Sequence, residues 1–140
     1  MAGQQEYVDI AIIGAGIAGS ALALALADSG YRIALVEARE LVRDSLPVSA
    51  GLLDFDARVS ALTPRSVSWL GELGAWEGVA RYRCCPYGHM TVWDAEGTGR
   101  IEFDRRELGA PALGYIVENR ALVDALLAQV LKTTAIRRFS

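Results

Sequence analysis

The feature that most constrains the fold is a glycine-rich turn between an apolar run and an alanine-rich segment. The turn reads Gly14-Ala-Gly-Ile-Ala-Gly19, and residues 7–13 before it are typical of a strand buried on both faces. Residues 20–28 are rich in alanine and leucine and predict a helix that stops at Ser29-Gly30. Residues 32–36 predict a second buried strand. This order predicts a βαβ unit with parallel strands.

The spacing of the glycines predicts a dinucleotide-binding turn. Gly14 allows a tight turn, Gly16 lets the backbone approach a diphosphate, and Gly19 lets the helix pack close to the strand. The helix N-terminus would direct its amides at the diphosphate, so Ala18 is a further candidate contact. Glu37 ends the second strand, where its carboxylate can accept the hydroxyls of an adenosine ribose and would repel a 2′-phosphate.

The sequence after Glu37 bears on which dinucleotide is bound, because NAD and FAD share their ADP half. A simple NAD domain would continue soon with another helix and strand. This chain instead enters a loop over residues 39–56, a short extended piece at 58–62 and a helix from Thr63-Pro64 to about Leu73. That departure favours a flavoprotein with an inserted section facing the substrate. A stand-alone NAD-binding domain and a non-catalytic docking module remain as alternatives.

The second half of the chain predicts an antiparallel insertion and a return to the parallel sheet. Residues 90–93 and 100–103 alternate apolar and polar side chains, which indicates a hairpin with one face covered. A strand at 115–117 and a helix over 120–132 capped by Asn119 follow. Residues 133–139 would begin another strand, whose exposed apolar edge predicts association or poor solubility. The predicted fold is α/β: a Rossmann-like βαβ unit with a parallel sheet and an inserted antiparallel hairpin, apparently truncated.

Composition excludes several other classes of protein. The net charge of −3 and pI near 5.1 argue against nucleic-acid binding, and the lone histidine, His89, argues against a histidine metal cluster. Residues 10–27 are uncharged, yet no lysine or arginine precedes them, so we expect neither a signal peptide nor a membrane span. Adjacent Cys84 and Cys85 form no disulfide framework and suit a reducing compartment. We therefore expect a cytoplasmic protein without a metal site.

Three further blocks of sequence carry a family resemblance. Together with the glycine turn, residues 54–66 (DFDARVSALTPRS), 70–76 (LGELGAW) and 114–122 (GYIVENRAL) resemble the ubiquinone-biosynthesis branch of the class A flavoprotein aromatic hydroxylases. The resemblance runs from about Tyr7 to Leu131. It implies an FAD-dependent monooxygenase that uses NAD(P)H and O₂ to hydroxylate a polyprenylated phenol.

The resemblance also implies roles for individual residues. The arginine matching Arg58 lies beside the flavin, the arginine matching Arg120 contacts FAD from the start of its helix, and the acid matching Glu37 holds the adenosine ribose. From the residues alone, Arg58 can equally form a surface ion pair with Asp54 or Asp56. Arg120 stands at the helix end that disfavours cations, a conflict that an anionic ligand would remove. The alternative for Arg120 is an ordinary side chain in solvent at the start of the helix, without a ligand.

The family's later Asp-Gly and Gly-Asp motifs have no match in this chain. We therefore expect residues 1–140 to be the N-terminal part of an FAD-binding domain, with residues 85–118 as an excursion toward a substrate domain. We expect no hydroxylation by these 140 residues alone, and no catalytic residue is named. A polyprenyl substrate is compatible with peripheral association at the inner membrane or with a biosynthetic complex. The oligomeric state stays open.

Overall fold

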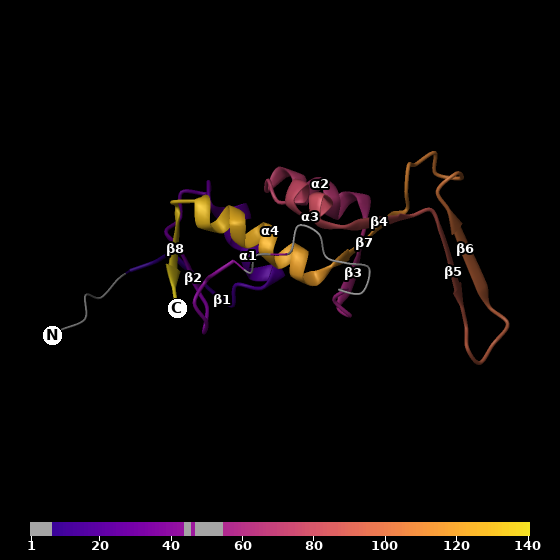
Figure 1. The fold of residues 1–140 in the computed structure, drawn as a ribbon, viewed down its shortest axis with the longest axis horizontal. Coiled ribbons are helices and arrows are strands. Elements are labelled where there is room, and N and C mark those ends of the chain that lie inside the picture. Colours follow the sequence, from indigo (N-terminus) through magenta and orange to yellow (C-terminus); the bar gives the residue numbers. More distant parts are fainter. Residues whose placement is uncertain (1–6, 44–45, 47–54) are drawn as a thin grey trace.

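The computed structural model describes residues 7–43, 46 and 55–140. The elements are, in chain order, β1 (Ile10–Ile13), α1 (Ile17–Leu26), β2 (Ile33–Val36), β3 (Val59–Leu62), α2 (Pro64–Glu72), α3 (Trp76–Tyr82), β4 (Cys84–Tyr87), β5 (His89–Trp93), β6 (Arg100–Asp104), β7 (Gly114–Glu118), α4 (Asn119–Lys132) and β8 (Ile136–Phe139). Figure 1 shows an elongated molecule, with β1, β2 and β8 toward one end, the β5–β6 ribbon at the other, and the helices between them.

The first sheet is parallel and has the strand order β1-β2-β8. This pairing confirms the βαβ unit and the expected last strand, which lies at a sheet edge; the association expected there stays a prediction. The prediction that the first strand is buried on both faces is wrong. Ile12 is buried, whereas Ala11 is exposed and Ile13 is 78% exposed. The helices cover only one face of β1, while the first three residues of β2 are all buried.

Two helices cover the parallel sheet and pack against each other. α1 begins at Ile17, three residues before the predicted start, so Gly19 lies inside the helix. Ala21 and Ala23 of α1 are buried, and small side chains of this kind let α1 and α4 approach closely. The core against the sheet combines side chains of the strands and both helices: Ile12, Ala15, Ala23, Ile33, Leu35, Leu127, Val130 and Ile136.

The chain turns sharply between α2 and α3. The N-cap of α2 is Thr63, as predicted, and its Oγ1 accepts a hydrogen bond from the Ser66 N–H (3.2 Å). Gly74 has φ +72° and ends that helix. Trp76, two residues after this glycine, begins α3. These helices pack on α4 in a second core: Ala21, Leu70, Ala75, Val79, Val117, Ala121, Leu122, Ala125 and Leu126.

An antiparallel sheet with the order β3-β7-β4 adjoins this second core. β7 confirms the strand expected at 115–117. β4 was not predicted, because its sequence, Cys84-Cys-Pro-Tyr87, lacks a run of β-branched residues and contains a proline. Pro86 is compatible with this place because β4 is an edge strand.

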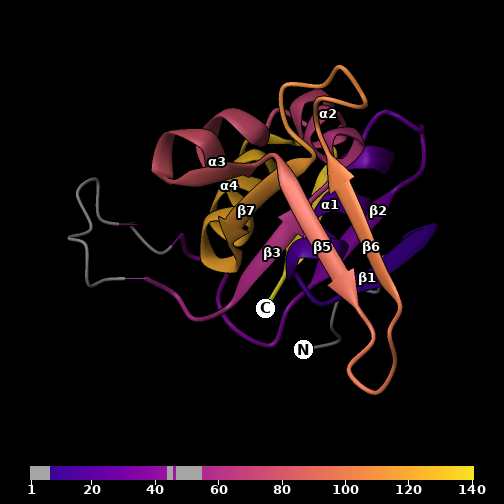
Figure 2. The same ribbon diagram turned by 90° about the vertical axis from the view of Figure 1, so that its right-hand side faces the viewer.

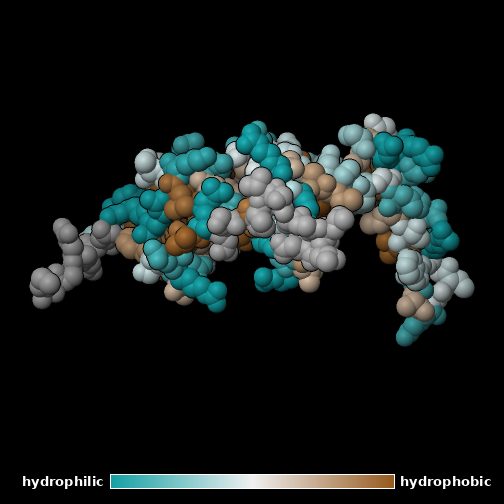
Figure 3. Space-filling model, viewed as in Figure 1, coloured by the Kyte–Doolittle hydropathy of each residue, from teal (hydrophilic) through white to brown (hydrophobic). Residues whose placement is uncertain are grey.

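The β5–β6 hairpin confirms the predicted pair of strands, with Met90 opposite Phe103 and Val92 opposite Ile101. These four apolar side chains share one face, but each of them is at least 39% exposed. The prediction of a covered face is therefore wrong for the described residues. Figure 1 shows the ribbon set apart from the helices at one end of the molecule, and Figure 2 looks onto this ribbon from that end. Figure 3 shows both hydrophobic and hydrophilic residues at its surface.

Candidate functional site

The glycine turn joins β1 to α1 and depends on two glycines for its shape. Gly14 has φ +97°, a conformation that disfavours residues with a side chain. A Cβ on Gly19 would lie 1.9 Å from the carbonyl oxygen of Gly14, so only glycine fits where the helix crosses the turn. Gly14 and Gly19 are thus explained by the fold itself, as the sequence predicted for the tight turn and the close packing.

Gly16 is not explained in that way. It is the N-cap of α1, and a Cβ placed on it would meet no heavy atom within 4 Å. No side chain caps the helix, and no acidic residue lies in its first turn. The first amides of a helix lack partners within the helix, and Ala18 among these residues is exposed. The end of α1 therefore offers open space and backbone donors, which fits the diphosphate of FAD.

Glu37 lies beside this helix end, as the sequence predicted. The Ala15 N–H donates to Oε2 of Glu37 (2.8 Å), and the Ala38 N–H donates to Oε1 (2.8 Å). These amides, Ala15 first, together with Arg39, hold the pKa of Glu37 below its usual value. The carboxylate is therefore ionised at neutral pH. Each of its oxygens can accept more than one hydrogen bond, which leaves capacity for ribose hydroxyls.

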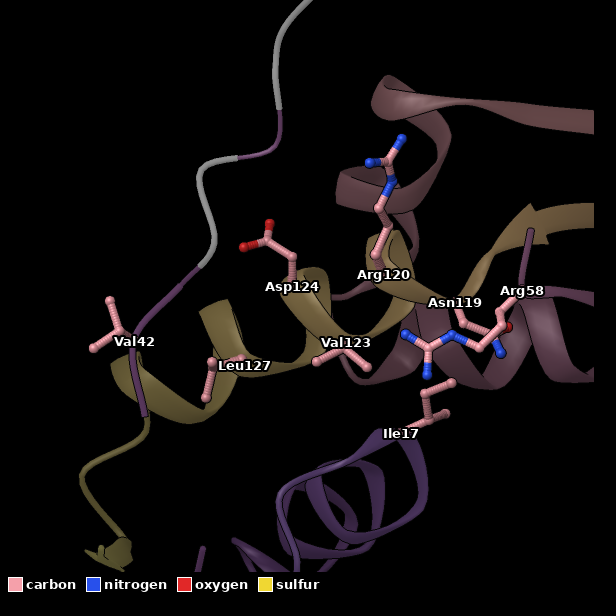
Figure 4. A pocket seen from close by; sticks show the side chains of 8 residues that line it. All are labelled: Ile17, Val42, Arg58, Asn119, Arg120, Val123, Asp124 and Leu127. Carbon is pink, nitrogen blue, oxygen red and sulfur yellow. The ribbon is translucent and has the colours of Figure 1, made fainter. Parts of the chain in front are cut away.

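A pocket opens beside Ile17, the first residue of α1. Its lining comes from α1, from the segment before β3, from the loop after β2 and above all from α4 (Figure 4): Ile17, Val42, Arg58, Asn119, Arg120, Val123, Asp124 and Leu127. Arg43 and Asp124 form an ion pair at its edge, with 2.7 Å between Nη2 and Oδ2. The start of α1 thus adjoins Glu37, through the Ala15 N–H, and the pocket, through Ile17.

Arg58 is held in the pocket by its backbone. Its N–H donates to Oδ1 of Asp56 (3.0 Å), and its carbonyl accepts from the Asn119 N–H (3.0 Å). The side chain is 83% exposed, and Nε lies 3.9 Å from Oδ1 of Asp56, so the predicted surface ion pair is present but long. Asp54, the other predicted partner, lies outside the described residues. Figure 4 shows the guanidinium reaching toward Ile17 at the start of α1.

Arg120 has a partner that the sequence interpretation did not contain. Its Nε donates to Oε2 of Glu118 (2.8 Å), and its guanidinium carbon lies 5.5 Å from the ring centre of Tyr82. Figure 4 shows the side chain pointing away from Ile17, unlike that of Arg58. Glu118 is only 4% exposed. Glu118 therefore supplies a negative charge next to Arg120, where the sequence indicated an anionic ligand. The sequence held one signal of this residue, because a charged side chain directly follows the apolar run Tyr115-Ile-Val117.

The predicted cap of α4 is wrong. The N-cap is Glu118, without a side-chain cap, and Asn119 is the first residue of the helix. Instead of capping, Oδ1 of Asn119 accepts a hydrogen bond from Oγ of Ser60 (2.6 Å). The Asn119 N–H donates separately to the Arg58 carbonyl. The contact with Ser60 ties the start of α4 to the strand that follows Arg58.

His89 and the two cysteines do not line this pocket. His89 Nδ1 is 3.8 Å from Oδ2 of Asp104, its cross-strand neighbour in the hairpin. Cys84 and Cys85 are free thiols in β4. Across residues 7–43, 46 and 55–140, no three histidine, cysteine, aspartate or glutamate side chains are placed to hold a metal ion together. In the same ranges, no helix combines the length and the apolar character needed to cross a bilayer.

Comparisons with known proteins agree with this architecture. The family model for FAD dependent oxidoreductases matches residues 9–133. The chain is 43% identical over 124 residues to the 3-demethoxyubiquinol 3-hydroxylase of Escherichia coli, covering 86% of this chain and 29% of that protein. It is 38% identical over 132 residues to the mitochondrial ubiquinone biosynthesis monooxygenase of Danio rerio, covering 91% and 26%. The chain thus spans less than a third of these relatives.

Solved structures share the fold. The structure of PqsL from Pseudomonas aeruginosa matches with a TM-score of 0.63 at 20% identity, over 96% of this chain and 33% of that one. The p-nitrophenol 4-monooxygenase PnpA from Pseudomonas putida matches with a TM-score of 0.60 at 14% identity, over 92% and 30%. The fold, the open cradle at Gly16 and the matched residues agree with one another, and the chain belongs to the FAD-dependent oxidoreductase family.

Proposed function

We propose that this chain supplies the FAD-binding region of a monooxygenase that hydroxylates a polyprenylated phenol in ubiquinone biosynthesis, with NAD(P)H as the reductant and O₂ as co-substrate. The observation that carries this proposal is the 43% identity to the E. coli 3-demethoxyubiquinol 3-hydroxylase, in a chain whose α1 N-terminus is uncapped and open. FAD, when bound, supplies the redox chemistry that activates O₂ for hydroxylation of an aromatic ring.

The residues of this chain would hold the cofactor rather than perform the chemistry. The turn residues Gly14, Gly16, Ala18 and Gly19 bring the backbone and the first helical amides up to the diphosphate. Glu37 is ionised and is fixed by the Ala15 N–H, and its carboxylate accepts hydrogen bonds from the hydroxyls of the adenosine ribose. This division explains why Gly16 is open while Gly14 and Gly19 are constrained by the fold.

The two arginines of the pocket complete the proposed cofactor site. Arg58 reaches toward Ile17 at the start of α1, so its guanidinium can neutralise the diphosphate there, and the resemblance also places the matching arginine beside the flavin. Arg120 lines the same pocket and carries a second positive charge at the start of α4. Its Nε is bonded to Glu118, and the other guanidinium nitrogens carry the remaining donors of the side chain.

Residues 85–118 are proposed to face the substrate. β4 and β7 at the two ends of this range belong to the antiparallel sheet, and the β5–β6 ribbon between them extends away from the FAD-binding elements (Figure 1). Its exposed face of Met90, Val92, Ile101 and Phe103 is chemically suited to an apolar neighbour. A polyprenylated substrate also leads us to propose peripheral association with a membrane, or membership of a biosynthetic complex.

The visible absorption spectrum of the purified chain tests the cofactor assignment. The chain is incubated with FAD and desalted, and the flavin bands should remain with the protein. A parallel titration with NADH addresses the alternative of an NAD-binding domain, which the comparisons do not favour. Loss of all flavin on desalting, together with saturable NADH binding, would contradict the proposal.

A further inference from the structure

We infer that Glu118 is a positioning residue for both arginines of the FAD pocket. The inference rests on the proposed function, because it concerns how the chain prepares that pocket for the diphosphate. Glu118 does not line the pocket itself. It lies at the junction of β7 and α4, and it is buried, with only 4% of its surface exposed. A carboxylate at such a place is costly unless its neighbours compensate its charge.

The first line of support is the pair of donors on one carboxylate oxygen. Oε2 of Glu118 accepts from Nε of Arg120 (2.8 Å) and from the backbone N–H of Asp56 (3.0 Å). The first contact fixes the guanidinium of Arg120. The second fixes the chain two residues before Arg58, at the point where it enters the pocket. One oxygen atom therefore joins the two arginine-bearing segments, which are 62 positions apart in the sequence.

The second line of support is how Arg58 is held. Its N–H is bonded to the side chain of Asp56, and its carbonyl is bonded to the Asn119 N–H, directly after Glu118. The side chain is 83% exposed and makes only a long contact with Asp56. The direction of the Arg58 guanidinium therefore depends on the backbone of residues 56–58. Glu118 anchors the beginning of that segment.

The third line of support is the charge balance around Glu118. Oε1 lies 3.0 Å from Nε of Arg83, whose guanidinium carbon lies 4.2 Å from the centre of the Phe55 ring and 4.9 Å from that of Tyr82. One carboxylate therefore stands between two guanidinium groups, Arg83 and Arg120. Removing that charge would weaken the attraction that holds both guanidinium groups at this junction.

The test is a double-mutant cycle on FAD affinity, measured by quenching of flavin fluorescence in the 140-residue chain. Glu118→Gln, which keeps the size of the side chain but not its charge, should weaken FAD binding about tenfold. The same change made in an Arg58→Ala, Arg120→Ala background should weaken it by less than about twofold, because there is no arginine left to position. Glu77→Gln is the matched control, since it removes the charge of an arginine-paired glutamate on the exposed face of α3.

A general loss of structure would produce a different pattern. It would weaken FAD binding by the same factor in both backgrounds, and this additivity would overturn the inference. Glu118→Asp serves if Glu118→Gln does not fold: its charge is kept, but the shorter side chain cannot reach Arg120 and Asp56 together, so the same coupling is expected. Failure of the unmodified chain to bind FAD would instead contradict the proposed function, and the inference with it.

Discussion

The proposed FAD site has two halves that are built in different ways. The turn half, which runs from Gly14 to Glu37, is continuous in sequence and is shaped by backbone conformation and by one close approach. The arginine half joins residues 56–60 to the start of α4 through side-chain contacts of Glu118 and Asn119. The turn half therefore takes its shape whenever the βαβ unit folds. The arginine half depends on individual charged side chains, each of which a single substitution can remove.

The largest expected effect belongs to the turn half. Gly19→Ala would place a Cβ 1.9 Å from the Gly14 carbonyl oxygen, so the helix must move off the turn. We expect a loss of about 3 kcal/mol in the free energy of unfolding, measured by urea denaturation, because overpacking on rigid backbone cannot relax. A fully stable Gly19→Ala variant would show that the turn is more adaptable than the fold implies.

Gly16→Ala separates ligand binding from folding in the same turn. No heavy atom lies within 4 Å of the new Cβ, so the unfolding free energy should change by no more than about 1 kcal/mol, the usual size of an N-cap effect. FAD affinity should fall at least about tenfold, because the methyl group occupies space proposed for the diphosphate. Fluorescence titration measures the affinity. Unchanged affinity would place the diphosphate elsewhere.

Arg58→Ala examines the arginine half directly. Its guanidinium is 83% exposed, so the thermal midpoint should hardly change. FAD affinity should fall about tenfold at low salt, and the difference from the unmodified chain should shrink as salt is added, because screening weakens interactions between exposed charges. Isothermal titration at two salt concentrations checks this. An effect that does not depend on salt would argue against a charge interaction with the diphosphate.

The pH dependence of stability distinguishes the halves again. Backbone donors lower the pKa of Glu37 in the folded chain, so the unfolded state binds the proton more readily. Glu37 thus contributes stability above its unfolded pKa of about 4.3, and that contribution is lost as the pH falls through the lower folded pKa. In urea melts from pH 7 to pH 3, Glu37→Gln should lose less stability than the unmodified chain. An equal loss would mean that the Ala15 contact is not maintained in solution.

The smallest effect is expected in the β5–β6 ribbon, which lies outside both halves. Val92→Thr keeps the β-branched shape on an exposed face, so stability should change by less than about 0.5 kcal/mol. FAD affinity should not change. A larger loss of stability would show that the ribbon is covered in solution, which would revive the prediction of a buried hairpin face.

The sequence predicted the turn half well because its determinants are local. Glycine spacing, an apolar strand on each side and an acid at the second strand's end lie within 24 residues, from Gly14 to Glu37. The arginine half was predicted only through family resemblance. Glu118 was missed because its partners, Asp56 and Arg83, come from distant segments. The Asn119 cap failed for the same reason, since a tertiary bond to Ser60 outweighs a local preference.

Burial was also predicted incompletely. An apolar run such as Ile10–Ile13 and an alternating pair such as β5 and β6 indicate faces suited to burial, but not what covers them. In the described part of the chain, other elements cover one face of β1, whereas both faces of the β5–β6 ribbon are largely exposed. One helix boundary also shifted, because Gly19 lies inside α1 rather than before it, whereas α2 ends next to Gly74 close to the predicted residue.

The most direct test of the central claim is a competition experiment with FAD bound to the 140-residue chain. ADP and riboflavin, which carry the two halves of the cofactor, are each added while flavin fluorescence and retention on a desalting column are followed. The account predicts that ADP displaces FAD and that riboflavin at the same concentration does not, because Glu37 and the glycine turn both bind the ADP half. Displacement by riboflavin but not by ADP would contradict it.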